Sequence, residues 1–211
     1  ERESTFMILP IHLLGTDVLR EPTERIDADS PELQSLIDDM IETMHGASGI
    51  GLAAPQIGRK ERLFVVDVSP MERDFEEAGL EMPEQPMIFL NAEIVAESED
   101  DSDFEEGCLS IPDIHEVVIR PDAIRLRYQD RNLKEMEEEF DGILSRVIQH
   151  EYDHVDGVLF IDHLSAFKRR LLRRRLEDIR QGLTEAEYPV YADGKRVIEP
   201  KEIDERSGED I

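Results

Sequence analysis

The sequence is short of cysteine and of long apolar runs, and each shortage excludes a class of protein. One of its 211 residues is a cysteine, Cys108, so no internal disulfide can form. No stretch approaches the roughly 18 consecutive apolar residues that a transmembrane helix needs. The apolar segment 6–14 is short, is broken by Pro10 and His12, and lacks the charged start and cleavage site of a signal peptide. We therefore expect a cytoplasmic protein that does not enter a membrane.

Positive charge is also scarce. The chain has 24 Lys and Arg against 51 Asp and Glu, which gives a formal net charge of −27. Because phosphate binding needs positive charge, nucleic acid is not expected as the main substrate, and no DNA partner is expected. A halophilic-like surface, adapted to concentrated salt, would explain the excess, since ions screen the repulsion among carboxylates. A merely acidic surface is the alternative.

The chain divides into a long patterned part and a short polar end. Its first 180 residues show no repeat and no obvious linker, which suits a single core, and we expect residues 1–181 to form one domain. From Gly182 onward the sequence is polar, acidic and interrupted by proline. Residues 182–211 are therefore expected to be a loosely ordered acidic tail.

Two helices are predicted from capping residues and apolar spacing. Ser30 as N-cap and Pro31 at the first helical position predict a helix that ends near Gly46. Ser165 predicts a second N-cap, with a helix that continues to about Arg180. The apolar side chains expected on one side of this second helix are Phe167, Leu171, Leu172, Leu176 and Ile179.

Short strands are predicted between these helices. Apolar or alternating runs indicate strands at 63–68, 87–90, 93–96, 116–119, 123–128 and 135–140. Residues 49–58 and 69–86 are expected to be loops because they are rich in glycine and proline or in charge. The acidic segment 97–106 is expected to be a solvated turn.

The most informative motif is H-E-x-x-H at residues 150–154, inside the segment 143–157, which has helical apolar spacing. Residues i and i+4 share one face of a helix, so His150 and His154 can point at one ion. Glu151 can then lie beside a water on that ion. The pattern predicts a metal-dependent hydrolase. The expected fold is α+β, with short antiparallel strands packed around this central metal-binding helix and an additional C-terminal helix.

Two histidines leave the metal site incomplete, because a catalytic zinc site takes three protein ligands and keeps one open position. In one protease pattern a third histidine would follow at position 160, where this chain has Phe160. A downstream acid, Glu177 or Asp178, would instead make the chain a metalloprotease. The other candidate is Cys108, which follows a glycine and offers a strong soft thiolate ligand. A lone cysteine can also be a small buried side chain.

Three segments together resemble the peptide deformylases. Residues 49–56, GIGLAAPQ, match that family's G-x-G-x-A-A-x-Q; residues 106–110, EGCLS, match E-G-C-x-S; and residues 149–157, QHEYDHVDG, match Q-H-E-x-D-H-x-x-G. They occur in the family's order, and the resemblance covers about residues 6–180. It implies a catalytic deformylase-like domain that hydrolyses the N-formyl group of N-formylmethionine on newly synthesised polypeptides and releases formate.

The resemblance also implies roles for individual residues. The metal ligands would be Cys108, His150 and His154, holding one divalent ion, Fe(II) in the cell, with Zn, Ni or Co also accepted. Glu151 would take the proton of the attacking water and hand it to the leaving amine. The Gln56 side-chain amide and the Leu109 N–H would donate to the oxyanion. The substrate-binding positions implied are Ile50, Gly51, Phe104, Gly107, Ile143 and Val147.

One basic segment stands out in this acidic chain. Residues 165–181 carry seven basic and two acidic side chains, a net charge of +5, whereas the rest of the chain carries −32. The family resemblance supports docking of this helix on ribosomal RNA or protein near the exit tunnel; a solvated face neutralised by nearby carboxylates is the alternative. A metalloprotease and a non-catalytic ribosome- or nascent-chain-binding module remain the alternatives to a deformylase.

Overall fold

The computed structural model describes residues 7–79, 81–192 and 196–200, and its mixture of helices and strands confirms the α+β class. The main sheet is antiparallel, with strand order β2-β3-β4-β7-β8. These strands are Gly51–Ala53, Leu63–Val66, Met87–Glu97, Ala123–Gln129 and Glu135–Asp141. A separate hairpin pairs β5 (Asp101–Cys108) with β6 (Ile111–Pro121). In the described residues, no helix is long and apolar enough to cross a membrane.

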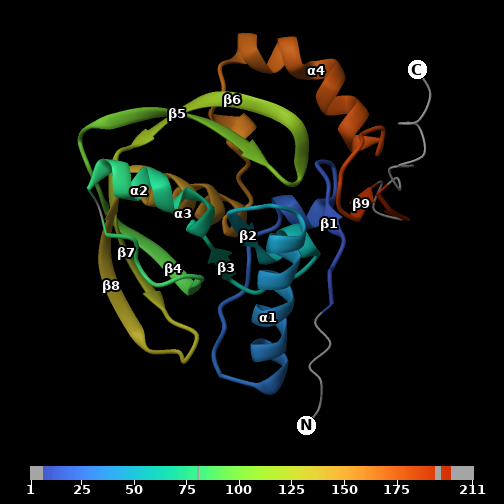
Figure 1. Ribbon diagram of the computed structural model, residues 1–211. Coiled ribbons are helices and arrows are strands. Elements are labelled where there is room, and N and C mark those ends of the chain that lie inside the picture. The colour runs from blue at the N-terminus through green and yellow to red at the C-terminus, as the bar shows by residue number, and fades with distance from the viewer. Residues whose placement is uncertain (1–6, 80, 193–195, 201–211) are drawn as a thin grey trace, which may run out of the picture.

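Helix α3 (Gly142–Val155) lies between the main sheet and the β5–β6 hairpin (Figure 1). Its buried Val147 and Ile148 belong to the same apolar cluster as Phe64 of the sheet. On the hairpin side, Gln149 Nε2 donates to the Pro121 carbonyl at 2.9 Å. Gly157 follows the helix with φ +74°, and a Cβ there would meet the Arg20 carbonyl oxygen at 2.9 Å, so the turn requires glycine. The helix predicted from the H-E-x-x-H segment is therefore held from both sides.

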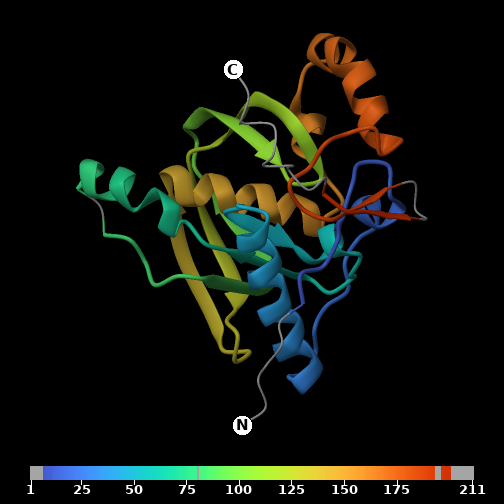
Figure 2. The same cartoon turned by 45° about the vertical axis from the view of Figure 1, so that its right-hand side comes forward.

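Helix α1 (Pro31–Gly46) has the predicted start and end. Ser30 Oγ accepts a hydrogen bond from the Leu33 N–H at 3.1 Å, as expected of an N-cap. The fully buried Ile37 and Met40 pack in a cluster with Leu52 of the main sheet. Figure 2 shows the short helix α2 (Glu72–Ala78) projecting at the left-hand edge of the molecule. The remaining helical turns are the 3-10 segments η1 (Asp17–Arg20), η2 (Ala54–Ile57), η3 (Ser69–Met71) and η4 (Phe160–His163).

Several expected loops and strand boundaries were wrong. The acidic segment 97–106 is largely strand β5, because every residue from Asp101 to Glu106 finds a partner on β6. The two strand pieces expected around Asn91 are one strand, β4, of 11 residues, so not all strands are short. The expected loop 49–58 contains β2 and η2, and the expected loop 69–86 contains α2.

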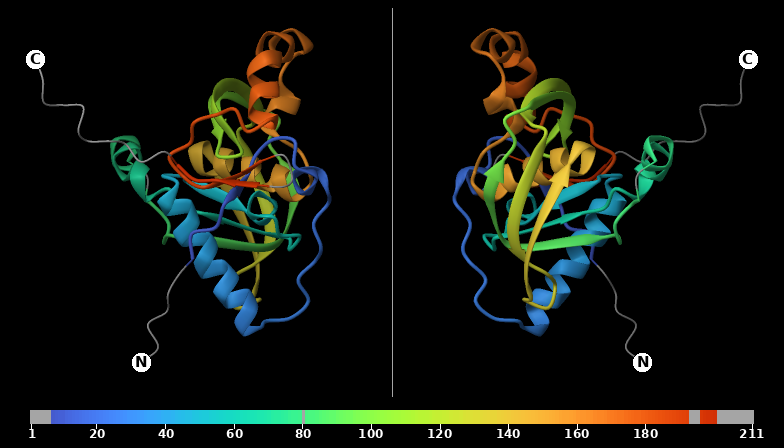
Figure 3. Two further views of the ribbon diagram at one scale, coloured as in Figure 1. Left: turned by 90° about the vertical axis from the view of Figure 1, so that its right-hand side faces the viewer. Right: turned by 90° about the vertical axis from the view of Figure 1, so that its left-hand side faces the viewer.

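Helix α4 (Ala166–Arg180) begins after Ser165, whose Oγ accepts from the Lys168 N–H at 3.2 Å as predicted. Its expected single apolar side was wrong, because the side chains of Phe167 and Leu171 are 71% and 68% exposed. Contact with the body is made by the buried side chains Leu172, Leu176 and Ile179. Figure 3 shows the helix standing beyond the β5–β6 hairpin at one end of the molecule.

The segment after residue 182 corrects the expectation of a loosely ordered tail. Strand β9 (Val190–Ala192) pairs in parallel with β1 (Ile11–His12) and antiparallel with β10 (Arg196–Ile198). Val190 is 2% exposed and packs in a cluster with α4. Backbone pairing with a distant strand therefore gives a regular structure to a stretch whose composition alone predicted no strand. The ordered part of the chain continues beyond residue 181. Residues 193–195 and 201–211 lie outside the described part.

Candidate active site

Three metal-ligating side chains meet where β5 ends against α3. Cys108 closes strand β5, while His150 and His154 lie one turn apart on α3. Their donor atoms all lie within 4.8 Å of one another, and this is the one such group that the described residues form. Cys108 Sγ lies 3.2 Å from His154 Nε2. Because Glu177 and Asp178 are not in this group, the third donor is Cys108 rather than a downstream acid.

A buried carboxylate orients one of the two histidines. Glu106 Oε2 lies 3.0 Å from His150 Nδ1, which leaves His150 Nε2 free to face the other donors. Arg120 Nε and Nη2 donate to the same carboxylate at 2.7 and 3.0 Å, which makes a buried Glu106–Arg120 ion pair. Burial raises the pKa of Glu106, but the hydrogen bonds from His150 and Arg120 outweigh it and hold that pKa far below its ordinary value. Glu106 is therefore a stable anion.

The donor set fits a divalent metal ion. One sulfur and two imidazole nitrogens make three protein ligands, as in catalytic sites that keep an open position. Burial, followed by the nearby charge of His150, lowers the pKa of His154 well below its ordinary value, so its imidazole is neutral, the form that binds metal. Phe160, at the position of an extra histidine in some proteases, is instead buried, with its ring centroid 6.1 Å from that of His150.

Glu151 is buried beside these donors without joining them. Its residue is 4% exposed, and its Oε2 finds no hydrogen-bond partner in the described chain. Burial raises the pKa of Glu151 to about 7. Gly51 makes this position available, because a Cβ there would overlap the Glu151 carboxylate. A carboxyl group with a pKa near neutrality can both accept and release a proton at neutral pH.

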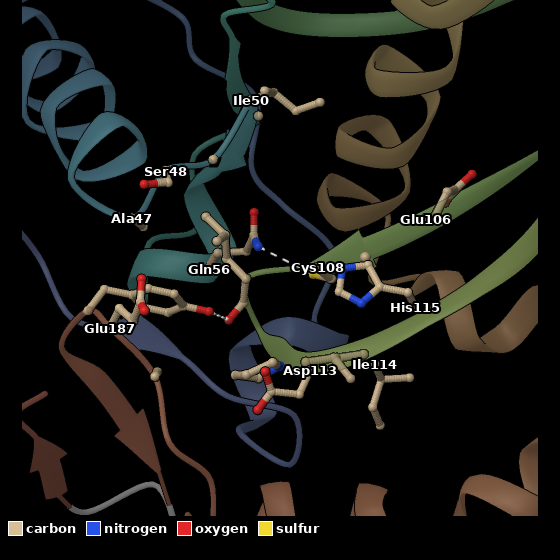
Figure 4. A pocket seen from close by; sticks show the side chains of 18 of the residues that line it. Ala47, Ser48, Ile50, Gln56, Glu106, Cys108, Asp113, Ile114, His115 and Glu187 are labelled. Atoms are coloured by element: carbon tan, nitrogen blue, oxygen red, sulfur yellow. Dashed lines mark hydrogen bonds between the residues drawn. The ribbon is translucent and has the colours of Figure 1, made fainter. Parts of the chain in front are cut away.

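Gln56 is fixed with its amide group facing Cys108. Its Oε1 accepts from the Ala53 N–H at 2.8 Å, while its Nε2 lies 3.5 Å from Cys108 Sγ and 3.2 Å from Ser110 Oγ. Figure 4 shows this amide pointing across the cleft toward the cysteine. Gln56 thus accepts a backbone hydrogen bond through its oxygen and turns its N–H groups toward Cys108.

One cleft of about 1100 Å³ is lined by Gln56, Glu106, Cys108, His150 and Glu151. The six positions expected to bind substrate line the same cleft: Ile50, Gly51, Phe104, Gly107, Ile143 and Val147. Leu109 also lines it. The structure therefore brings the expected catalytic and substrate positions together, although they come from three separate parts of the sequence.

Sequence reasoning missed two contributors to the site. Arg146, 4% exposed, donates to Glu106 at 3.1 Å and to the Ser102 carbonyl at 2.6 Å, so it ties α3 to the hairpin. The sequence signal that could have revealed Arg146 is its place on the buried face of α3, where an unpaired charge would be costly. The segment 184–188 also lines the cleft, although it falls in the expected tail.

Asp153, inside the H-E-x-x-H motif, forms no hydrogen bond with either of the two histidines of that motif. It accepts hydrogen bonds from Arg120 and from His163, at 2.7 Å each.

The fold and the site define a metal-dependent hydrolase, since a Cys-His-His donor set has a buried carboxyl group beside it, at the wall of one cleft. The family model for polypeptide deformylase matches residues 8–170, and the chain belongs to this family.

Relatives and solved structures agree with that assignment. The chain is 58% identical over 184 residues to the peptide deformylase of Salinibacter ruber, an alignment that covers 87% of this chain and 94% of the relative. It is 45% identical to the peptide deformylase of Prosthecochloris aestuarii, with 87% and 95% covered. The crystal structure of a peptide deformylase from Legionella pneumophila matches with a TM-score of 0.71 and 37% identity, covering 82% of this chain and 95% of that one. That of Synechococcus elongatus in complex with actinonin matches with a TM-score of 0.68 and 35% identity, covering 83% and 89%.

Proposed function

We propose that this protein hydrolyses the N-formyl group of N-formylmethionine on newly synthesised polypeptides and releases formate. The observation that carries the proposal is the Cys108, His150 and His154 donor cluster with Glu151 buried beside it on one cleft. Membership of the polypeptide deformylase family supports it. The metalloprotease alternative is not favoured, because the acids that it needs lie on α4, outside the donor cluster.

The proposed roles of the metal ligands and Glu151 follow from their positions. Cys108, His150 and His154 would hold one divalent ion, which would lower the pKa of a water ligand and so supply a nucleophile near neutral pH. Glu151 accepts the proton of the attacking water and delivers it to the leaving amine. A pKa of about 7 suits both halves of that transfer. The anionic Glu106 keeps His150 in the orientation that presents its Nε2.

Two donors are proposed for the negative charge that develops on the formyl oxygen. The Gln56 amide is already fixed toward Cys108 by its bond to the Ala53 N–H, so no reorganisation is needed during the reaction. The Leu109 N–H, on the residue after Cys108, is the second donor. One such donor is typically worth about 3–4 kcal/mol of transition-state stabilisation.

The substrate is proposed to bind along the cleft in an extended form. Its methionine side chain would contact Phe104, Ile143 and Val147, which give the cleft an apolar end. Its backbone would lie as an added strand between Gly107 of β5 and the start of β2, at Ile50 and Gly51.

Formate release from formyl-Met peptides, measured without oxygen, tests the function. We expect release by protein loaded with Fe(II), Ni, Co or Zn. Metal analysis of protein prepared anaerobically identifies that ion; we propose Fe(II). Absence of formate release from fully metal-loaded protein contradicts the proposed function.

Helix α4 is proposed to dock on the ribosome, in the cytoplasm. Its exposed Phe167, Arg170, Leu171 and Arg174 recur at three- and four-residue spacing and so share one face. Other basic residues of α4 contact the body, as Lys168 does with Glu116 at 2.9 Å. Changing Arg170, Arg173 and Arg174 to Glu should weaken salt-dependent ribosome binding while hydrolysis of a formyl tripeptide is unchanged. Unchanged ribosome binding would exclude this docking surface.

The acidic surface is proposed to be an adaptation to concentrated salt. Strand β5 illustrates the pattern, with Asp101, Asp103 and Glu105 all exposed at alternate positions. Carboxylates this close repel one another, and ions screen that repulsion. The midpoint of thermal unfolding should therefore rise between low and molar salt, and a midpoint that fails to rise contradicts the proposal.

A further inference from the structure

The C-terminal segment returns to the active site after α4. Backbone hydrogen bonds fix it against β1, from the Ile11 N–H to the Pro189 carbonyl and from the Leu13 N–H to the Tyr191 carbonyl, both at 2.9 Å. Residues 184–188 then line the cleft, on the side where Figure 4 shows Glu187, across from Ile50. This segment lies beyond residue 170, where the match to the family model ends.

Tyr188 connects this segment to the residue that follows the candidate ligand Cys108. Its hydroxyl donates to the Leu109 carbonyl at 2.8 Å. Its ring packs against two buried clusters at once, one around Ile114 and one around Ile11, so the hydroxyl is held in place. Burial raises the pKa of Tyr188, so the hydroxyl is a protonated donor at neutral pH.

The turn at Leu109 is positioned by contacts from elsewhere in the chain. The Ser110 carbonyl accepts from the Leu14 N–H at 2.9 Å, and Ser110 Oγ accepts from Gln56 at 3.2 Å. The Leu109 side chain lies so close to Gly49 that a Cβ there would come within 2.8 Å of Leu109 Cδ1. Tyr188 supplies the contact to the Leu109 carbonyl, so Leu109 is held through its side chain and its carbonyl while it lines the cleft.

We infer that Tyr188 is a positioning residue of the deformylase reaction, which holds Leu109 so that its N–H meets the oxyanion. The inference rests on the proposed function and on the donor role proposed for Leu109. Tyr188 acts through the Leu109 backbone and does not touch the formyl group. Complete loss of an oxyanion donor typically lowers kcat about 10²–10³-fold. A donor that is displaced but still present should lower kcat by a smaller factor.

Tyr188→Phe tests the inference because it removes the hydroxyl and keeps the ring. We expect kcat for a formyl-Met tripeptide to fall about tenfold, with KM and the inhibition constant of the deformylated product within about twofold of wild type. Metal content should be unchanged. Tyr191→Phe is the matched control, since Tyr191 lies in the same segment and makes no hydroxyl hydrogen bond in the described residues; its ring is tilted against that of His12, with the centroids 4.4 Å apart. Its kinetic constants should equal those of wild type.

Three results overturn the inference: a kcat of Tyr188→Phe within about twofold of wild type, an equal fall in Tyr191→Phe, or a loss of bound metal that accounts for the loss of rate. Each of these leaves the proposed function intact, because wild-type protein still releases formate. Failure of the proposed function is a different result, namely no formate release from metal-loaded wild-type protein.

Discussion

The buried carboxylate of Glu106 offers the sharpest test of the site, through Glu106→Gln. Its side chain is 5% exposed and contacts Arg120, Arg146 and His150. The amide keeps the shape but removes the charge, and it brings an NH2 group against a guanidinium. Arg120 retains Asp153 at 2.7 Å, whereas the other partners of Arg146 are the neutral groups of Ser102 and Val118. The substitution therefore leaves buried positive charge without a counter-ion.

Two losses should follow from this change. Breaking a buried ion pair by removing one partner typically costs about 3–5 kcal/mol, so the free energy of unfolding in urea should fall by that amount. Removing the group that orients a ligand histidine typically costs about 10–100-fold in metal affinity, measured by chelator competition.

The pH dependence of the unfolding free energy gives a third readout. Because the folded state lowers the pKa of Glu106, its stabilisation is complete above the ordinary value of 4.5 and is lost as the pH falls below it. Glu106→Gln should remove this part of the acid limb of stability.

Asp38→Asn is the matched control for the Glu106 substitution. Asp38 also pairs with an arginine, Arg131 at 2.6 Å, but both side chains are 35% exposed. Exposed pairs are worth about 0–1 kcal/mol, so this variant should lose little stability and no metal. If Glu106→Gln keeps its metal affinity within about twofold, or loses no more stability than Asp38→Asn, the role assigned to the buried network is wrong.

Three further substitutions separate metal binding from catalysis. Cys108→Ser should lose bound metal, and full retention in metal analysis contradicts the ligand role. Glu151→Gln should retain metal while formate release falls about 10²–10⁴-fold. The raised pKa of Glu151 makes metal-free wild-type protein lose stability as the pH rises from 4.5 to about 7. Above pH 7, metal-free Glu151→Gln should therefore be more stable than metal-free wild type by about 3 kcal/mol in urea unfolding. If the variant gains no stability, the raised pKa is refuted. Gly51→Ala should displace the Glu151 carboxylate and lower kcat about 10²-fold with metal retained; wild-type kcat would show that the space at Gly51 is dispensable.

The elements that the sequence predicted well are those fixed by local geometry. The α1 cap at Ser30 and the α4 cap at Ser165 are both present, because an N-cap depends on a side chain and a backbone N–H three residues away. Strand β5 was missed because its composition is acidic and its order comes from pairing with β6. Strand β9 was missed for the same reason, since its partner β1 lies at the other end of the chain.

The sequence by itself determined the chemistry that this protein can perform. Two histidines four residues apart share a helix face wherever that helix lies, and the adjacent glutamate follows with them. The family resemblance also named Cys108 and Gln56, but only the tertiary structure brings them to the helix, and only it shows the contact of Tyr188. Cys108 meets His154 across 46 residues, Gln56 meets Cys108 across 52, and Tyr188 meets Leu109 across 79. Contacts at such separations depend on how the sheet, the hairpin and α3 pack together, and no local pattern encodes that packing.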